Sequence, residues 1–336
     1  MDFALDESQV LLQDSLRTLL EGACPTSLVR EAADDRRVAS SLDEHLASWV
    51  ELAQGPAVDL CICFEQLGAF AAPGAFAPTT LLFTPLLEAA GHPLAERAFR
   101  GEVRGTVALA DRSGRWAVHD DPLKCFVWEP TLADFVAVLH RYRGSNRLAV
   151  VERLSAPVTV TATLDLSREF GTLDASSLGE VDWSEVRDEA LESVLRVATV
   201  ATAADMIGTA KTILDKTIEY AAQRIQFDRP IGSFQAVKHK LADMALAYER
   251  AWSAVYYSAM CIDADDPLAA RSVHVAKASA GSAATLCAKD GLQIHGGIGY
   301  TWENDLHLYV RRVYGSESMF GTTQMHEDEA GRDLLV

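Results

Sequence analysis

The residues best suited to hold an anion lie in the segment YAAQRIQFDRPIGSFQAVKHKLADM, residues 220–244. Its proline and glycine predict that one helix ends near Gln223 and that another begins near Ser233. Arg224, in the loop between them, carries planar donors that suit a phosphate or a carboxylate. The start of the second helix adds free N–H groups and the positive end of a helix dipole. An equally open interpretation is that Arg224 caps the carbonyls of the preceding helix.

A second segment, QIHGGIGYTWEN at residues 293–304, could bring bare backbone close to a ligand. It has three glycines within four residues, and glycine lacks the side chain that would hold a ligand away. A single glycine is enough to end a helix in the left-handed arrangement. The additional glycines therefore favour a ligand, although one glycine-rich loop is a weak signal by itself.

The third stretch is SMFGTTQMHE, residues 318–327, in which Phe320 directly precedes a Gly-Thr-Thr-Gln turn. A phenyl ring has no atom that accepts a proton, so Phe320 cannot act as a general base. Glu317, three residues and about one helical turn before Phe320, could serve as a general base displaced from that position. It could also be simply an exposed charge. Thr322 and Thr323 could contact a ribose, but N-capping of a following helix already explains them.

These segments must be positioned by long helices in the last part of the chain. Residues 188–222 contain no proline and carry apolar residues at helical spacing, which predicts a helix of roughly 50 Å. Further helices are expected at residues 234–262, 268–295, 302–313 and 322–334. Long amphipathic helices of this kind usually pack as a bundle.

The first part of the chain is also predicted to be helical, whereas the middle is rich in β-branched residues. Helices are expected in the opening segment, at residues 42–53, at 59–70 and from residue 79 in TTLLFTPLLEAAG. Strands are expected in GTVALAD, RWAVHD, CFVWEP, FVAVLH, RLAVVERL and VTVTATLDL. These short runs predict a small β-domain that leans on its helical neighbours. The predicted domains are residues 1–103, 104–182 and 183–336.

The composition excludes several classes of function. A formal net charge of −18 leaves no basic surplus for nucleic acid or for a polybasic membrane surface. The opening MDFALDESQ has no basic n-region, and no apolar run reaches about 18 residues, so we expect neither signal peptide nor membrane span. Cys61 and Cys63 lack the C-x-x-C spacing of zinc and redox sites, and the histidines show no metal-ligand spacing. We therefore expect a cytoplasmic protein with reduced thiols and no metal site.

The motifs R-x-x-F-x-x-P-I-x-x-F-Q-A-V-x-H-x-L-A-D-M and Q-I-x-G-G-x-G-Y-T-x-E resemble those of the acyl-CoA dehydrogenase family. MDFALDESQ and LDLSREF, residues 164–170, also resemble family landmarks. The resemblance covers the whole chain and is strongest over residues 200–324. It implies an α+β, mostly α fold with an N-terminal helical domain, a small middle β-domain and a C-terminal four-helix bundle. It also implies FAD chemistry, in which a carboxylate abstracts the α-proton of an acyl-CoA and a hydride passes from Cβ to flavin N5.

In this family, the arginine loop and the glycine loop reach across a dimer interface and hold the ADP half of the neighbouring subunit's FAD. Carried over to this sequence, that role falls to Arg224, Phe234, Gln235, Gln293, Gly296 and Gly297. The chemistry of these segments agrees with that role, since an arginine side chain, a helix N-terminus and exposed glycine backbone are all suited to bind a pyrophosphate.

The sequence departs from the family at the positions where a family member binds its own flavin ring and acts on its own substrate. Phe320 takes the place of the usual catalytic glutamate, and Ala198 takes the alternative place of that base on the long helix. VALADRSGRWAVHD, residues 107–120, lacks the Y-x-x-T-E-type loop that contacts the flavin ring. FVW, residues 126–128, lacks the hydroxyl of the Trp/Tyr-Ile-Thr/Ser element. The N-terminal region also lacks a Glu- and Gly-rich segment between its second and third long helices.

The resemblance therefore implies a non-catalytic subunit of a heteromeric acyl-CoA dehydrogenase, with FAD shared across the interface with a full-length partner. It is similar to the shortened subunits of the α2β2 enzymes that actinobacteria use on steroid-CoA thioesters. The acyl-CoA would be bound mainly by the partner. Two alternatives stay open: a self-sufficient homomeric dehydrogenase with a displaced base such as Glu317, and a structural relative that binds no flavin.

Overall fold

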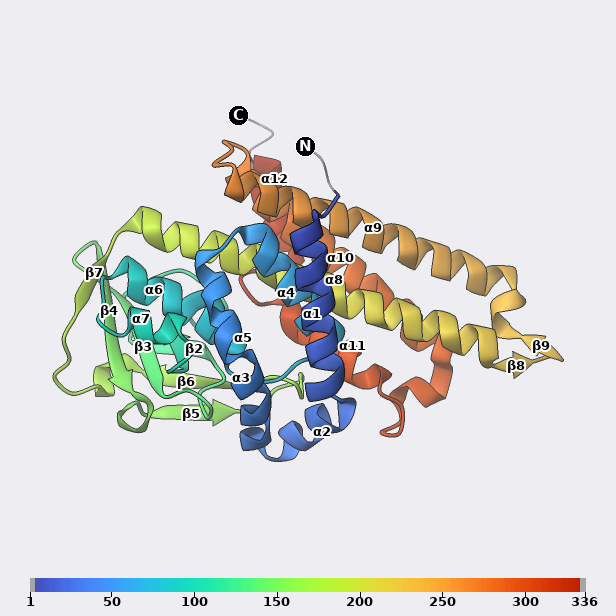
Figure 1. Cartoon of the computed structure of the whole chain (residues 1–336), viewed down its shortest axis with the longest axis horizontal. Coiled ribbons are helices and arrows are strands. Elements are labelled where there is room, and N and C mark those ends of the chain that lie inside the picture. Colours follow the sequence, from blue (N-terminus) through green and yellow to red (C-terminus); the bar gives the residue numbers. More distant parts are fainter. Residues whose placement is uncertain (1–3, 333–336) are drawn as a thin grey trace.

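Helices make up both ends of the chain and strands make up its middle (Figure 1). The computed structural model describes residues 4–332, so the first three residues of MDFALDESQ and the end of the helix predicted at 322–334 lie outside the described residues. Within the described range, no helix is both long and apolar enough to cross a membrane. Apolar residues from all three parts of the chain pack into one shared core.

The N-terminal part is helical, as predicted, but contains more short elements than the sequence indicated. Its helices are α1 (Glu7–Ala23), α2 (Thr26–Asp34), α3 (Ser40–Leu46), α4 (Ala57–Ala69), α5 (Phe76–Pro78), α6 (Thr84–Ala89) and α7 (Ala95–Phe99). The start of α1 is set by a capping box, in which Asp6 accepts from the N–H of Gln9 at 2.9 Å and Gln9 accepts from the N–H of Asp6 at 3.1 Å. Both α2 and α7 were missed, because each is too short to show a clear helical period.

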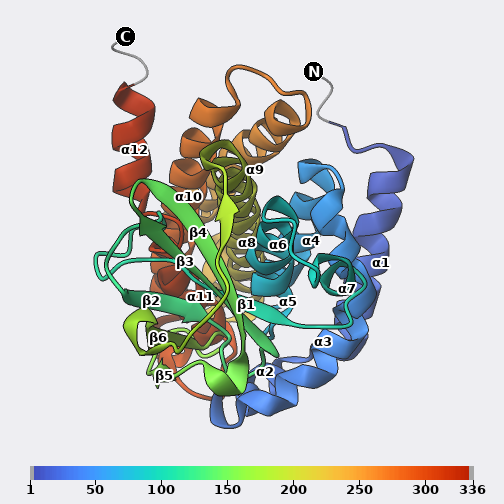
Figure 2. The same ribbon diagram turned by 90° about the vertical axis from the view of Figure 1, so that its left-hand side faces the viewer.

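The middle part consists of two small sheets. The first has the order β1 (Gly105–Ala108), β3 (Phe135–Tyr142), β4 (Ser145–Glu152), β7 (Ser184–Val186), with only β1 and β3 parallel. The second is antiparallel, with the order β2 (Leu123–Trp128), β6 (Phe170–Asp174), β5 (Val158–Thr161). In Figure 2 the strands lie in front of the C-terminal bundle, with the N-terminal helices to their right and α12 above them on the left.

One predicted strand is wrong. RWAVHD, residues 115–120, is an irregular loop, which begins with a turn in which Asp111 Oδ1 accepts from the N–H groups of Ser113 and Arg115. The alternation that suggested a strand arises because Trp116 and Val118 are buried while their neighbours are exposed. Side-chain burial alone therefore reproduced the period of a strand without any ladder of backbone hydrogen bonds.

The C-terminal part is a helical bundle, as predicted. It contains α8 (Asp188–Gln223), α9 (Gln235–Asp263), α10 (Ala269–His295), α11 (Leu306–Glu317) and α12 (Thr323–Arg332). Helix α10 packs against α8, α9, α11 and α12, and the short hairpin β8 (Ile225–Gln226) to β9 (Arg229–Pro230) joins α8 to α9. The middle of α8 is buried on all sides, because α4 of the N-terminal part covers the face that α9 and α10 leave open.

Helices α4 and α8 touch through their backbones. A Cβ atom at Gly68 would overlap the carbonyl oxygen of Asp205, and one at Gly208 would overlap that of Glu65. Thr209 Oγ1 also donates to the carbonyl of Gly68 at 3.1 Å. The two helices are thus in direct contact at this crossing, with no room for a side chain between them.

Gly208→Ala is expected to lower the free energy of unfolding by about 1–3 kcal/mol, because the new methyl group would force the two helices apart. Urea denaturation followed by circular dichroism measures the change. Gly22→Ala in α1 is the matched control, since a Cβ there meets nothing within 4 Å and a helical Gly→Ala change costs no stability. Equal stability of Gly208→Ala and the wild type would contradict the close contact.

Candidate functional site

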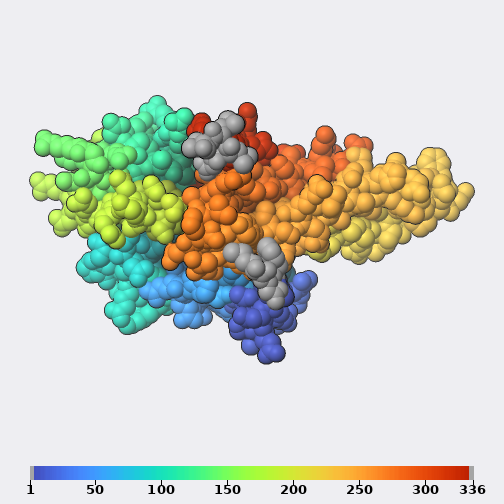
Figure 3. Space-filling view, turned by 90° about the horizontal axis from the view of Figure 1, so that it is seen from above, coloured from blue at the N-terminus to red at the C-terminus, as the bar shows by residue number. Residues whose placement is uncertain are grey.

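The end of the bundle formed by residues 220–236 projects from the molecule, as the yellow and orange arm of Figure 3 shows. Arg224 directly follows α8, and its backbone N–H donates to the carbonyl of Tyr220 at 2.8 Å. Its side chain is exposed, and within residues 4–332 its guanidinium makes no hydrogen bond or ion pair. The donors of Arg224 therefore face outward and do not cap the carbonyls of α8.

The start of α9 lies beside Arg224 and is uncapped. Phe234 is the N-cap residue and supplies no side-chain acceptor, so the first N–H groups of α9 stay available to a ligand. The ring of Phe234 is held by Arg229, whose guanidinium lies 4.1 Å from its centroid. Gln235 opens the helix with an exposed side chain. An uncapped helix start next to a free guanidinium is an arrangement that suits a phosphate.

The loop after α10 reaches the same end of the bundle. The ring of Tyr220, in the last turn of α8, stacks on His295 of α10 with centroids 4.4 Å apart. Gly296 has φ +64°, a left-handed conformation that favours glycine. Gly297 has neither a positive φ nor any atom within 4 Å of a built Cβ, so nothing inside this chain requires a glycine there. Together with the exposed Gln293, this loop presents bare backbone and an amide to whatever approaches from outside.

Two aromatic residues of this region were missed as contact candidates in the sequence. Phe227 is 86% exposed, has φ +53° and forms the tight turn between β8 and β9 together with Asp228. Tyr300, in the loop after α10, is 72% exposed. A phenylalanine in a left-handed turn position costs conformational energy without any gain in burial. The signal available in the sequence was a phenylalanine among the polar and charged residues Gln226, Asp228 and Arg229.

Phe320 lies in the core, in contrast to the exposed loops described above. It is 7% exposed, and its ring packs on Trp116 with centroids 4.4 Å apart. Lys277 of α10 holds the turn by donating to the carbonyls of Glu317 at 3.0 Å and Gly321 at 2.9 Å. Burial lowers the pKa of Lys277 to about 8. The turn before α12 is therefore held by the hydrogen bonds of the buried Lys277 and by the packing of Trp116 on Phe320.

The side chain of Glu317 contacts the start of α12. Its Oε1 accepts from the backbone N–H of Thr323 at 2.9 Å, at the first residue of α12. Thr322 completes the cap by accepting from the N–H of Met325 at 3.2 Å. The carboxylate of Glu317 thus stabilises a helix N-terminus. Ala198, on α8, is fully buried and offers no polar atom.

The segments that depart from the family pattern meet in space. Trp116 of the irregular loop contacts both Phe320 and Phe126 of β2, the latter with centroids 6.4 Å apart. Phe126 and Trp128 in turn lie 6.2 and 6.3 Å from Phe170. Hydroxyl groups that could bind a polar ring are replaced here by a cluster of aromatic rings that contact one another.

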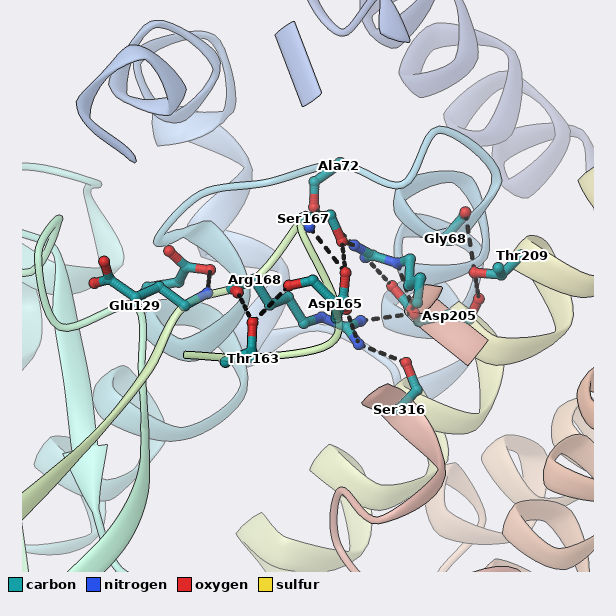
Figure 4. A network of polar contacts seen from close by, with 12 residues as sticks. Gly68, Ala72, Glu129, Thr163, Asp165, Ser167, Arg168, Asp205, Thr209 and Ser316 are labelled. Atoms are coloured by element: carbon teal, nitrogen blue, oxygen red, sulfur yellow. Dashed lines mark hydrogen bonds and ion pairs between the residues drawn. The ribbon is translucent and has the colours of Figure 1, made fainter. Parts of the chain in front are cut away.

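A buried polar network involves the LDLSREF segment (Figure 4), and its Arg168 lies 5.3 Å from the ring centroid of Trp128 in the cluster. Asp205 of α8 accepts from Arg168 at 2.7 Å and from Arg312 of α11 at 3.2 and 2.5 Å. Arg312 also donates to Ser167 at 2.7 Å, and Arg168 to Ser316 at 2.5 Å. Burial by itself would raise the pKa of Asp205, but the neighbouring guanidinium groups of Arg168 and Arg312 outweigh it and hold that pKa below its ordinary value. The network ties the middle part of the chain to α8 and α11.

The described residues hold no cluster of three or more His, Cys, Asp or Glu side chains that could bind a metal ion. At the projecting end, four of the residues predicted to bind the cofactor, Arg224, Gln235, Gln293 and Gly297, are exposed, and Phe234 and Gly296 are half-buried.

Comparison with known proteins gives consistent matches. A family model described as acyl-CoA dehydrogenase, C-terminal domain, matches residues 189–335. The acyl-CoA dehydrogenase IpdE2 of Mycobacterium tuberculosis is 30% identical over 326 residues, which cover 94% of this chain and 93% of that protein. The ChsE4–ChsE5 complex from Mycobacterium tuberculosis matches with a TM-score of 0.87 at 23% identity, over 100% of this chain and 99% of that chain. A Tcur3481–Tcur3483 steroid ACAD variant matches with a TM-score of 0.84 at 24% identity, over 98% of both chains.

Proposed function

Because the chain belongs to the acyl-CoA dehydrogenase family, we propose that it is the non-catalytic subunit of a heteromeric, FAD-dependent acyl-CoA dehydrogenase. In this proposal the projecting end completes an FAD site whose flavin ring, catalytic base and acyl-CoA belong to a full-length partner subunit. FAD, when bound, accepts the hydride from the β-carbon of the acyl-CoA. This chain's own part is to bind and orient the nucleotide half of that cofactor.

The observation that carries the proposal is a contrast between two regions: the projecting end, where the family binds the nucleotide half of FAD, and the position of the family's catalytic base. At the projecting end, the free guanidinium of Arg224, the uncapped start of α9 and the bare backbone at Gly297 fit a pyrophosphate. At the other place, Phe320 and Ala198 are buried apolar residues where a general base would be needed. This contrast supports a subunit that binds the tail of the cofactor and leaves the chemistry to its partner.

The exposed aromatic residues support a partner at the projecting end. Phe227 and Tyr300 flank the nucleotide-binding residues, and isolated large aromatic side chains next to a polar site are typical of interface anchors. The similar ChsE4–ChsE5 structure is a complex, which agrees with a heteromer.

The similar Tcur3481–Tcur3483 structure is described as a steroid ACAD. We therefore propose a steroid-derived acyl-CoA as the substrate of the assembled enzyme. We propose the cytoplasm as its location and residues 1–103, 104–182 and 183–336 as its domains.

The test is to purify the chain alone and after co-expression with a full-length acyl-CoA dehydrogenase subunit from the same organism. The chain alone is expected to be colourless and inactive, whereas the complex is expected to carry FAD and to desaturate an acyl-CoA. Flavin absorbance gives the number of flavins per pair of subunits, and dye reduction gives the activity. Clear dehydrogenase activity of the chain alone, with bound FAD, would refute the proposal.

Glu317→Gln is expected to leave the dehydrogenase activity of the complex essentially unchanged, since this carboxylate caps α12 and the glutamine amide oxygen can still accept the hydrogen bond from Thr323. A general base contributes about 10²–10⁴ to the rate, so its loss would be obvious in steady-state assays. Glu327→Gln on α12 serves as the control for a removed charge. A fall of that size in the Glu317 variant alone would support the alternative of a displaced base in this chain.

A further inference from the structure

Helix α12 is held on the bundle mainly through one buried side chain. The helix lies at the outer edge of the bundle beside α10 (Figure 2). Of its residues Thr323–Arg332, His326 alone is buried, with 6% of its surface exposed. At the start of the helix, Thr323 fits against Gly281 of α10, where a Cβ atom would overlap the threonine hydroxyl. A change at His326 therefore acts on the main buried contact of α12.

Both ring nitrogens of His326 have a partner. Nε2 lies 2.9 Å from the carbonyl oxygen of Phe320, and Nδ1 lies 2.9 Å from Nδ1 of His274 on α10. A carbonyl oxygen only accepts, so Nε2 of His326 carries a proton. In the neutral ring, Nδ1 of His326 therefore accepts from the Nδ1–H of His274. The ring fits closely over Gly321, since a Cβ atom there would lie 2.8 Å from Nε2.

This pair of histidines can hold at most one additional proton while α12 stays docked. One additional proton still leaves an N–H on one side and a lone pair on the other between the two Nδ1 atoms, so the hydrogen bond survives. A second additional proton would place two N–H groups face to face across 2.9 Å. Separated histidines take up two protons, because each titrates near its ordinary pKa of about 6.5. Below that pH, release of α12 is therefore coupled to the uptake of at least one proton.

The charged groups around His326 come from three elements. Lys277 of α10 acts on the ring electrostatically and disfavours a proton there. From α11, the carboxylate of Glu317 approaches the start of α12, where it accepts from the N–H of Thr323 at 2.9 Å. The remaining carboxylates belong to α12 itself and stay with His326 whether or not the helix is docked: Glu327, Asp328 and Glu329.

The balance of these effects favours the neutral ring in the docked helix. Burial lowers the pKa of His326 to about 4, against the hydrogen bond to Phe320 and together with the charges of Lys277 and His274. Because the docked pKa lies below the ordinary value of 6.5, the stabilisation is complete above that value and is lost as the pH falls towards the docked one.

We propose that the His274–His326 pair is an acid-sensitive latch, which holds α12 on the bundle at neutral pH and weakens its docking as the pH falls. Release would uncover the face of α10 around Gly281 and separate Thr323 from the carboxylate of Glu317. The latch goes beyond the proposed function, because both histidines belong to this chain and the device needs neither FAD nor the partner subunit.

The experiment measures hydrogen exchange of residues 323–332 in the full-length chain at pH 7 and pH 5.5, by mass spectrometry corrected for the intrinsic exchange rate at each pH. The opening constant of α12 is expected to rise about tenfold if the docked pair keeps one additional proton, and up to about seventyfold if it keeps none. Residues 206–214 of α8 contain neither histidine nor carboxylate and serve as the internal reference, whose opening should not change.

Two variants remove the buried titrating ring, so that a folding defect in one leaves the other. His326→Gln can still donate to the carbonyl of Phe320, and the double variant His274→Phe, His326→Phe keeps two packed rings. In both, the rise between pH 7 and pH 5.5 is expected to fall below about threefold. His239→Gln, at an exposed position of α9, is the control and should keep the wild-type rise. A wild-type rise below about threefold, or a full rise retained in both variants, would overturn the inference and leave the proposed function untouched.

Discussion

Asp205→Ala is expected to lower the free energy of unfolding by about 3–5 kcal/mol, the usual cost of removing one partner from a buried ion pair. The variant leaves two guanidinium groups, those of Arg168 and Arg312, buried without their carboxylate. It also disconnects the LDLSREF segment from α8, since Asp205 is the residue of α8 that both arginines contact. The effect should therefore reach the packing of the middle part on the bundle.

Chemical denaturation at neutral pH measures this change, with Asp215→Ala as the matched control on the same helix. Asp215 forms an exposed i,i+4 pair with Lys211, and exposed pairs contribute about 0–1 kcal/mol. Because the pKa of Asp205 is lowered by folding, its stabilisation is present above the ordinary value of 3.8 and is lost as the pH falls through the lower folded value. Similar losses for Asp205→Ala and Asp215→Ala would show that the network is not important for stability.

Arg224→Gln is expected to weaken FAD binding by the heteromeric complex about ten- to a hundredfold, the amount that one charge-assisted pair of hydrogen bonds contributes. Within residues 4–332 the side chain of Arg224 makes no hydrogen bond or ion pair that its loss could disturb, so the free chain should keep its stability. Fluorescence of released FAD measures the dissociation constant, and size-exclusion chromatography shows whether the complex still assembles.

The control for this experiment is Arg250→Gln, which removes an exposed arginine of α9 away from the projecting end. It should leave FAD binding unchanged. If Arg224→Gln complexes assemble and retain FAD with wild-type affinity, the structural relative that binds no flavin through this chain becomes the better explanation.

The elements of the bundle could be predicted because their signals are local. The limits of α8, α9 and α10 follow from helical spacing interrupted by proline and glycine, and the predicted limits agree with the structure within one or two residues. The strand predicted at residues 115–120 failed because Trp116 is buried by Phe320, a residue far away in the chain. No local pattern carries information about such a contact.

Arg224 and the glycines of the candidate site could be named from the sequence because an arginine loop and a surplus of glycines are local features, whereas Phe234, Gln235 and Gln293 were named from the family resemblance. The role of several of these side chains, however, depends on the tertiary structure. The exposed side chain of Arg224 does not cap the preceding helix, and the contact of Glu317 with Thr323 places that carboxylate at the start of α12. Each of these distinctions rests on what surrounds a side chain.

The sequence by itself determined that the chain is helical at both ends, that it resembles one enzyme family, and that Phe320 and Ala198 cannot accept a proton. These are properties of residue type and spacing. Only the tertiary structure decided that the departing segments meet as an aromatic cluster and that Asp205 joins two arginines from different parts of the chain. The reason is that burial and charge pairing arise between residues distant in the chain, and only the folded arrangement of the helices and sheets specifies which of them meet.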